Sequence, residues 1–223
     1  PILGTDLLFE EGTGTVEYDG TVDQTIFDID YYNLEIDGSG SKKVNHAELD
    51  VAGNLTVTAG TLDLANSGGG SENNAIDLEG NFLMNGGVFT AGISNSHNVA
   101  GDWNDVNGTF QAGASGDGTI TLSGAGSNIN TAASNNFFNL TINSAGAEVA
   151  QTALDIDGAF TILGGTFTNG NLTHDVAGDW NDVNGTYQAG AAVEGTIVLS
   201  GAGSNINTAA SNNFFNLTIN SAG

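Results

Sequence analysis

Paired aspartates are the residues of this chain whose type and spacing could support binding or catalysis. They form three pairs: Asp102 with Asp105, the recurring Asp179 with Asp182, and Asp155 with Asp157. Carboxylates at such spacings can bind Ca²⁺ or serve as the acid and base of sugar hydrolysis. A catalytic site is normally unique, whereas Asp102 and Asp105 recur, and this recurrence favours a structural role. Asp155 and Asp157 are expected on the wet face of a strand.

Calcium-binding sequence motifs give no support to these aspartates as ligands. The chain has neither the Gly-Gly-x-Gly-x-Asp nonapeptide nor a complete EF-hand loop. We therefore predict no catalytic, cofactor-binding or metal-binding residues and no cofactor. The alternative is Ca²⁺ bound to stacked carboxylates, where it would screen their charge rather than catalyse a reaction.

Histidine and lysine are the remaining residues that could act in catalysis. His46, His97 and His174 are scattered along the chain, and we expect turn residues rather than ligands or bases. A polysaccharide lyase needs a cationic base or charge clamp, but the chain has no arginine and only two lysines, Lys42 and Lys43. We therefore predict that the chain is not an enzyme.

The charge balance excludes several partners. The chain has 26 acidic and 2 basic residues, which gives a formal net charge of −24. Nucleic acids and anionic membranes are both bound by clusters of cationic side chains, so neither is an expected partner. No apolar run is long enough to cross a bilayer, and we predict no membrane insertion. The charge is compatible with a secreted surface exposed to salt or divalent cations.

Internal repetition dominates the rest of the sequence. Residues 97–146 return almost unchanged as residues 174–223, with only six differences between the two copies. Residues 1–96 are a divergent version of the same unit. Such self-similarity is typical of repeat architectures, in which each unit packs on its neighbours. We predict one domain over residues 1–223, built of repeats of about 77 residues.

The repeats contain short segments in which apolar and polar residues alternate around a glycine. Val51, Gly53, Leu55 and Val57 would point to one face, which is the pattern of a strand. Asn-Gly pairs supply corners, and they also fit hairpins of an antiparallel sandwich or barrel.

The spacing of the glycines favours a solenoid over hairpins. Equivalent glycines recur in the same order and direction at Gly53, Gly80 and Gly101, and again at Gly158 and Gly178. Identical units in the same order stack most simply as coils. We predict an all-β, right-handed parallel β-helix of roughly eight to ten coils, about 40–50 Å long at ~4.8 Å per coil.

Each coil is expected to bury one residue of two apolar columns. The first column would contain Leu55, Phe82, Trp103, Phe160 and Trp180, and the second Leu62, Phe89, Phe110, Phe167 and Tyr187. Trp103 and Trp180 could instead stack on sugars, but their place in an alternating inward column favours core packing.

Three phrases resemble the repeats of very large secreted bacterial surface proteins. They are Val51–Val57 (VAGNLTV), Phe138–Ile142 (FNLTI), and Gly101–Trp103 (GDW) with Asn107–Phe110 (NGTF). Those proteins are adhesin-like β-solenoids. The resemblance implies an extracellular location at the bacterial cell surface and a stalk, fibre or adhesive role, and it brings no site residues with it.

The expected function is therefore a rigid stalk, sheath or self-associating filament. Neither end of the sequence contains a polar capping coil, so we expect further covalent repeats or end-to-end stacking of copies. The alternative is an adhesin or glycan-binding module, with cell-surface or matrix glycans held by loops at residues 66–74 and 127–136.

Overall fold

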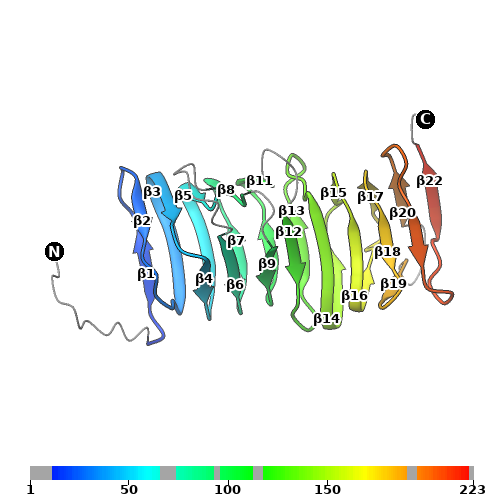
Figure 1. The fold of residues 1–223 in the computed structure, drawn as a ribbon, viewed down its shortest axis with the longest axis horizontal. Helices are drawn as coiled ribbons and strands as arrows, with labels where there is room; N and C mark the ends of the chain where they lie inside the picture. The colour runs from blue at the N-terminus through cyan, green and yellow to red at the C-terminus, as the bar shows by residue number, and fades with distance from the viewer. Residues whose placement is uncertain (1–11, 66–73, 93–95, 113–117, 190–194, 221–223) are drawn as a thin grey trace.

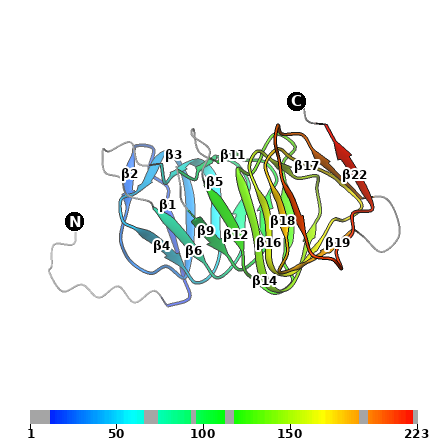
Figure 2. The same ribbon diagram turned by 45° about the vertical axis from the view of Figure 1, so that its right-hand side comes forward.

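The computed structural model describes residues 12–65, 74–92, 96–112, 118–189 and 195–220. Throughout these ranges the regular structure is strand, and every strand pairing is parallel. The strands stack as the turns of a β-solenoid of about nine turns, with β1 and β22 at opposite ends (Figure 1). The turns wrap around a common axis (Figure 2). The predicted parallel β-helix is confirmed, and the antiparallel alternative is wrong.

The described part of the chain contains 22 strands. They are β1 (Thr15–Tyr18), β2 (Gln24–Ile26), β3 (Asn33–Val44), β4 (Glu48–Val51), β5 (Leu55–Asp63), β6 (Ala75–Leu78), β7 (Phe82–Met84), β8 (Val88–Thr90), β9 (Ser96–Val99), β10 (Trp103–Asp105), β11 (Thr109–Gln111), β12 (Thr119–Leu122), β13 (Asn128–Thr131), β14 (Asn139–Ala150), β15 (Asp155–Ile156), β16 (Phe160–Thr168), β17 (Thr173–Val176), β18 (Trp180–Asp182), β19 (Thr186–Gln188), β20 (Thr196–Leu199), β21 (Ile206–Thr208) and β22 (Asn216–Ile219).

Strand pairing divides the solenoid into three faces. Face A contains β4, β6, β9, β12, the first parts of β14 and β16, β18 and β21. Face B contains β1, the first parts of β3 and β5, β7, β10, β13, the last parts of β14 and β16, and β19. Face C contains β2, the last parts of β3 and β5, β8 and β11, and then β15, β17, β20 and β22.

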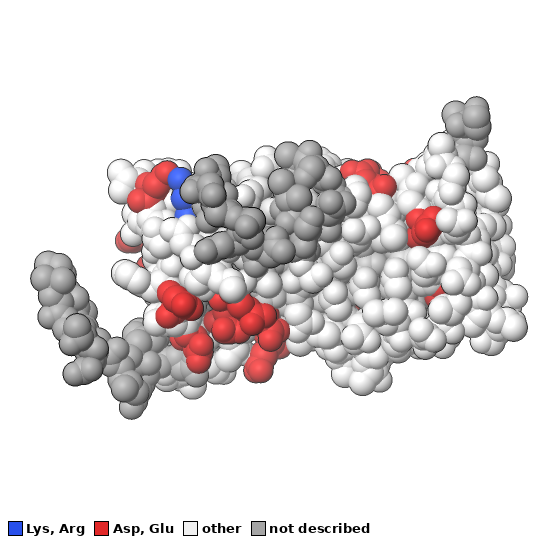
Figure 3. Space-filling view, viewed as in Figure 1, with Lys and Arg blue, Asp and Glu red and all other residues white. Residues whose placement is uncertain are grey.

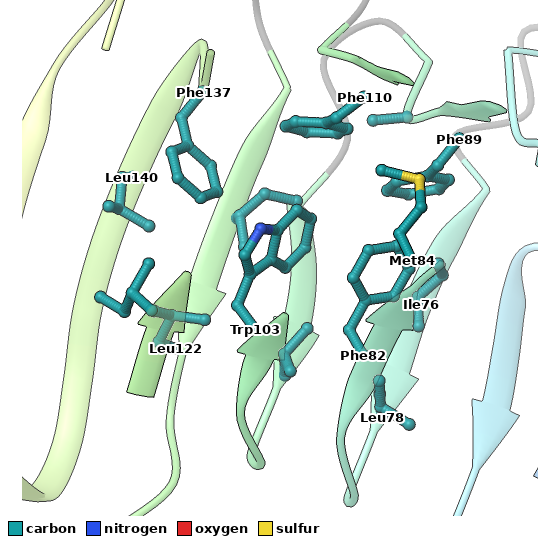
Figure 4. Packing of buried hydrophobic residues seen from close by; sticks show 14 of the residues in the cluster. Ile76, Leu78, Phe82, Met84, Phe89, Trp103, Phe110, Leu122, Phe137 and Leu140 are labelled. Atoms are coloured by element: carbon teal, nitrogen blue, oxygen red, sulfur yellow. The ribbon is translucent and has the colours of Figure 1, made fainter. Parts of the chain in front are cut away.

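The core is formed by inward side chains that lie directly above one another. Leu34, Leu55, Phe82 and Trp103 are consecutive partners on face B, and each is at most 1% exposed. The rings of Phe82 and Trp103 stack with centroids 4.4 Å apart, and Figure 4 shows both rings pointing into the interior. Burial of each such side chain contributes roughly 1.5–3 kcal/mol. The predicted stacking of Leu55, Phe82 and Trp103 is confirmed.

The two predicted columns are each split between faces, so their continuity was predicted wrongly. Trp103 is followed on face B by Ile129, whereas Phe160 and Trp180 pair on face A. In the same way, Leu62, Phe89 and Phe110 pair on face C, but Phe167 and Tyr187 pair on face B.

The physical reason is the length of the repeat. Each turn has three positions, one on each face. The chain advances by eleven such positions from β12 to the equivalent strand β20. In this count β14 and β16 each fill two positions and the bridge at Phe137 fills one. Eleven positions are three full turns and two thirds of a fourth. Equivalent residues of successive repeats therefore lie on different faces of the solenoid.

Glycine is required at the corner between faces A and B because adjacent turns approach closely there. A Cβ atom on Gly80 would lie 2.0 Å from the carbonyl oxygen of Gly53, and one on Gly101 would lie 2.3 Å from that of Gly80. This approach explains the glycine at the centre of the repeated segment.

Candidate functional site

The densest group of carboxylates in the described ranges lies on face A near the N-terminal end of the solenoid. Glu48 and Asp50 extend outward from β4, and Asp77 extends outward from β6, directly beside Asp50. One oxygen from each of these three carboxylates lies within 4.8 Å of the others. Figure 3 shows the carboxylates gathered there. We call Glu48, Asp50 and Asp77 the acidic cluster.

Mutual repulsion and burial act on the acidic cluster together. Burial raises the pKa of Asp50, the neighbouring carboxylates of Asp30 and Asp77 raise it further, and His46 opposes them. Asp77 accepts a hydrogen bond of 2.8 Å from the Asn98 side-chain amide. Oxygen atoms in this arrangement are the ligands that Ca²⁺ prefers.

The acidic cluster also borders a shallow groove. The groove has a volume of about 300 Å³ and is lined by Asp30, Tyr31, Asp50, Val51, Ala52, Asp77 and Glu79.

None of the aspartate pairs singled out by sequence spacing belongs to the acidic cluster. Its two aspartates come from segments of successive turns, Leu49-Asp50-Val51 and Ile76-Asp77-Leu78. Both segments alternate, so each aspartate points outward. That shared pattern is the signal by which the sequence could have placed them together.

The second half of the chain has a similar pair of aspartates on another face. Asp155 of β15 lies beside Asp175 of β17 on face C. Asp155 is equivalent to Asp50, whereas Asp175 stands where the first copy of the repeat has Asn98. Burial raises the pKa of Asp155, and the carboxylates of Asp157 and Asp175 add to the effect. Asp155 and Asp157 are both exposed, as expected for the wet face of a strand.

The side chains of the recurring pair Asp102 and Asp105 point in different directions and do not form a common site. Asp102 lies at the corner between faces A and B, where its Oδ1 accepts hydrogen bonds from the main-chain and side-chain amides of Asn128, at 2.8 and 3.3 Å. In the preceding turns, Asn33, Asn54 and Asn81 do the same for the main-chain N–H one turn later, at 2.8–3.1 Å. Asp102 therefore belongs to a ladder of side chains that joins successive turns.

Asp105 points inward and is fully buried. Its Oδ2 accepts a hydrogen bond of 2.5 Å from the Asn135 side-chain amide, which also donates to the carbonyl of Gly108 at 3.0 Å. Burial raises the pKa of Asp105 to about 6.

The later copy of this pair has the same two roles. Asp179 accepts hydrogen bonds from Asn205, and the Oδ1 of Asp182 accepts from the main-chain N–H of Ala209 at 3.1 Å. Both recurring pairs therefore bind neighbouring parts of the chain.

The expectation that all three histidines are turn residues is right for one of them. His46 lies in the bend between β3 and β4, with its Nδ1 against the Glu48 carbonyl and 3.4 Å from Asp28. His97 and His174 lie instead within β9 and β17, and each is 1% exposed. Both histidines lie at inward positions that alternate with outward polar residues, which is why these strands remain regular.

The two tryptophans pack in the core, as predicted. Trp103 and Trp180 are each 1% exposed. Their rings contact those of Phe82 and Phe160 in the preceding turns, with centroids 4.4 and 4.7 Å apart. A platform for sugar stacking needs an exposed ring face, and both indoles are covered.

Two buried ionisable residues were missed at the level of the sequence. Lys42 and Glu148 occupy the same position in the two 12-residue strands β3 and β14, and each is 0% exposed. The Lys42 ammonium donates hydrogen bonds to the carbonyls of Gly20 and Gly40, at 2.8 and 3.1 Å. Burial raises the pKa of Glu148. Alignment of the two strands puts both residues at inward positions and could have found them.

The structure describes only the last residue of the first expected glycan-binding loop, but all of the second. Residues 66–73 of the first lie outside the described residues, and Asn74 is buried. The second, residues 127–136, includes strand β13, and its Asn135 side chain is buried. Four of its residues border a groove of about 380 Å³ on face C, lined by Thr131, Ala132, Ala133, Asn135, Thr152, Ala153, Leu154, Asp155, Thr173, Asp175 and Val198.

Comparison with protein-family models, curated proteins and solved structures finds no match for this chain. Among the described residues there is no helix long and apolar enough to cross a membrane.

Proposed function

We propose that this chain is a rigid structural segment of a bacterial extracellular surface protein, used as a stalk, sheath or self-associating filament. The observation that carries the proposal is the unbroken stack of about nine parallel turns. A solenoid of this kind holds its ends at a fixed separation, because strand pairing joins each turn to the next on at least two of the three faces.

The roles of the polar side chains support a structural rather than a catalytic function. The recurring aspartates Asp102 and Asp179 hold corners, and Asp105 and Asp182 bind segments of the chain. We propose that the protein is not an enzyme. A net charge of −24 suits an extracellular surface in contact with salt, and the resemblance of the repeats to bacterial surface proteins agrees with it.

Self-association is supported by the residues on the last described turn. Leu217 and Ile219 of β22 are 38% and 66% exposed, whereas Leu140 and Ile142, their equivalents in the first copy, are fully covered by the next turn. We propose that this exposed apolar edge packs against a turn of a second copy, as the equivalent residues Leu140 and Ile142 pack against the next turn of their own chain.

A test of self-association uses two substitutions on one strand. Ile219→Asp places a charge where the next turn would pack, and Thr218→Asp places the same charge at the neighbouring alternate position. Sedimentation and negative-stain imaging should show rods that lengthen with concentration for the unmodified protein and for T218D, but not for I219D. If the unmodified chain stays monomeric at every concentration, self-association is excluded, whereas a stalk made of further covalent repeats is not.

The groove on face C favours a second candidate function, a glycan-binding module. Its alanines and threonines leave room beside the carboxylates of Asp155 and Asp175. Ala133→Trp would fill the groove, and Ala145→Trp, at an exposed position of β14 outside the groove, is the control. Glycan-array binding that is lost in A133W and kept in A145W would establish this function, and no binding by the unmodified chain would exclude it.

A further inference from the structure

His97 and His174 form the same pair of hydrogen bonds in successive repeats. The Nδ1 atom of His97 accepts a hydrogen bond of 3.2 Å from the main-chain N–H of Ile76, one turn earlier. Its Nε2 lies 2.9 Å from the carbonyl of Ala91. Because an N–H can only donate and a carbonyl can only accept, Nδ1 must be unprotonated and Nε2 must have the proton.

His174 repeats this geometry on a different face. Its Nδ1 accepts a hydrogen bond of 3.0 Å from the main-chain N–H of Leu154, and its Nε2 lies 2.9 Å from the carbonyl of Asn169. Each imidazole therefore connects a strand of one turn to the turn before it.

We propose that His97 and His174 are acid-sensitive joints between turns of the solenoid. Protonation of Nδ1 would turn an acceptor into a donor and set two N–H groups against each other in the core. The hydrogen bond to the preceding turn would be lost, and a charge would be left buried. This property goes beyond a structural role, since it gives the rod a built-in response to acid.

Apolar side chains surround both rings. His97 packs between Ile76 and Ile120 and against the edge of Phe89, with ring centroids 5.9 Å apart. His174 lies beside Ile197 and the ring of Phe167, whose centroid is 5.6 Å away. A charge on either imidazole would therefore be surrounded by hydrocarbon.

The carboxylates of the adjoining described strands are turned outward or already bound. Asp77 and Asp175 point outward, and each accepts a hydrogen bond from a side chain beside it. Asp105 and Asp182 are buried at the ends of β10 and β18, where amide groups of later segments donate to them. None of these four carboxylates forms an ion pair with His97 or His174.

Burial lowers the pKa of both His97 and His174 to about 4, against an opposing effect of the hydrogen bonds to Ala91 and Asn169. The sign of the pH dependence follows from that direction. Because the folded protein binds these protons less tightly than the unfolded chain, stability is lost as the pH falls from about 6.5 towards about 4. At pH 5 the folding equilibrium constant should be lower than at pH 7 by about 20-fold for each histidine.

The test compares thermal unfolding of the full chain between pH 7 and pH 4 with that of matched variants. The variant His97→Gln with His174→Gln keeps a neutral side chain that can accept from the preceding turn and donate to the corner carbonyl. The control His46→Gln changes the histidine in the bend. We expect the melting temperature of the unmodified protein and of H46Q to fall below pH 6.5, and that of the double variant to fall less.

A second measurement keeps the proposal testable if the double variant does not fold. Nitrogen chemical shifts of the imidazoles report tautomer and pKa directly in the unmodified chain. Two rings that stay neutral and Nε2-protonated down to pH 5 support the joints. Rings that titrate near 6.5 in the folded protein, or melting curves that shift equally for the unmodified chain and the double variant, would overturn them.

Discussion

At the scale of single residues, the interior of this solenoid contains ionisable side chains in rows where the neighbouring turns have apolar ones. Lys42 lies in the same inward row as Leu62, Phe89 and Phe110, and Glu148 lies beside Phe167. Burial of an ion without a partner of opposite charge costs several kcal/mol unless hydrogen bonds compensate. Lys42 has two carbonyl acceptors, whereas within the described ranges neither oxygen of Glu148 makes a hydrogen bond of ordinary geometry.

Glu148 is therefore expected to destabilise the protein when it is ionised. Its pKa is raised by burial, so the stability it contributes at low pH is lost as the pH rises through the folded-state pKa. Glu148→Gln removes this loss and should raise stability at pH 7 by roughly 1 kcal/mol, a change in melting temperature of about 2–4 °C. At pH 4 the variant and the unmodified protein should melt together. A gain of equal size at both pH values would show that ionisation is not the cause.

At the scale of the strand and corner, the close approach of turns limits what the sequence can contain. Gly80 and Gly164 make the contrast testable, since a Cβ on Gly80 would meet a carbonyl oxygen at 2.0 Å but one on Gly164 would find its nearest atom at 3.4 Å. Gly80→Ala should destabilise the protein by roughly 1–3 kcal/mol, and Gly164→Ala should change it little. Chemical denaturation of both variants measures this. Similar midpoints for the two would show that the corner adjusts to a side chain.

Much of this level of structure can be predicted from the sequence, because alternation is a local property. Leu55, Phe82 and Trp103 share one pattern of neighbours, and they stack as that pattern predicts. The placement of Phe160 and Trp180 on another face could not be read in the same way. It depends on how many strand positions the chain passes between Trp103 and Phe160. That number depends in turn on long-range contacts such as the pairing of β13 with the end of β14.

The candidate site was harder to predict than the fold for a related reason. Glu48, Asp50 and Asp77 are neighbours because β4 and β6 are one turn apart, although the whole of β5 and residues 64–74 separate them along the chain. Spacing along the chain therefore pointed to Asp102 and Asp105, which the strand places on opposite sides. The burial of Lys42 depends on two carbonyls, and its only signal in the sequence is an inward position in the aligned strands β3 and β14.

At the scale of the whole molecule, the repeat length sets how the surface is displayed. The chain from β12 to β20 falls a third of a turn short of four full turns. The chain from β1 to β12 contains one more turn and falls a third of a turn short of five. These three equivalent strands consequently lie on faces B, A and C in chain order. The acidic pairs follow this rule, with Asp50 and Asp77 on face A and Asp155 and Asp175 on face C. Carboxylates are thereby distributed around the axis, which reduces the repulsion that a single acidic stripe would produce.

The remaining repulsion is concentrated at the acidic cluster, and cations should relieve it. Raising NaCl from about 10 mM to about 1 M shortens the screening length from about 30 Å to about 3 Å. We expect the melting temperature to rise over this range, and to rise less for the variant Asp50→Asn with Asp77→Asn. Asp37→Asn, at an exposed position of β3 outside the cluster, should respond to salt as the unmodified chain does.

The same series of melting temperatures, measured with millimolar CaCl₂ at constant ionic strength, separates screening of the acidic cluster from binding of the ion. An extra rise with Ca²⁺ that D50N/D77N lacks would mean that Glu48, Asp50 and Asp77 chelate the ion. An equal rise for Ca²⁺ and Na⁺ at matched ionic strength would mean that they only attract it, and no response to either would refute repulsion at the cluster.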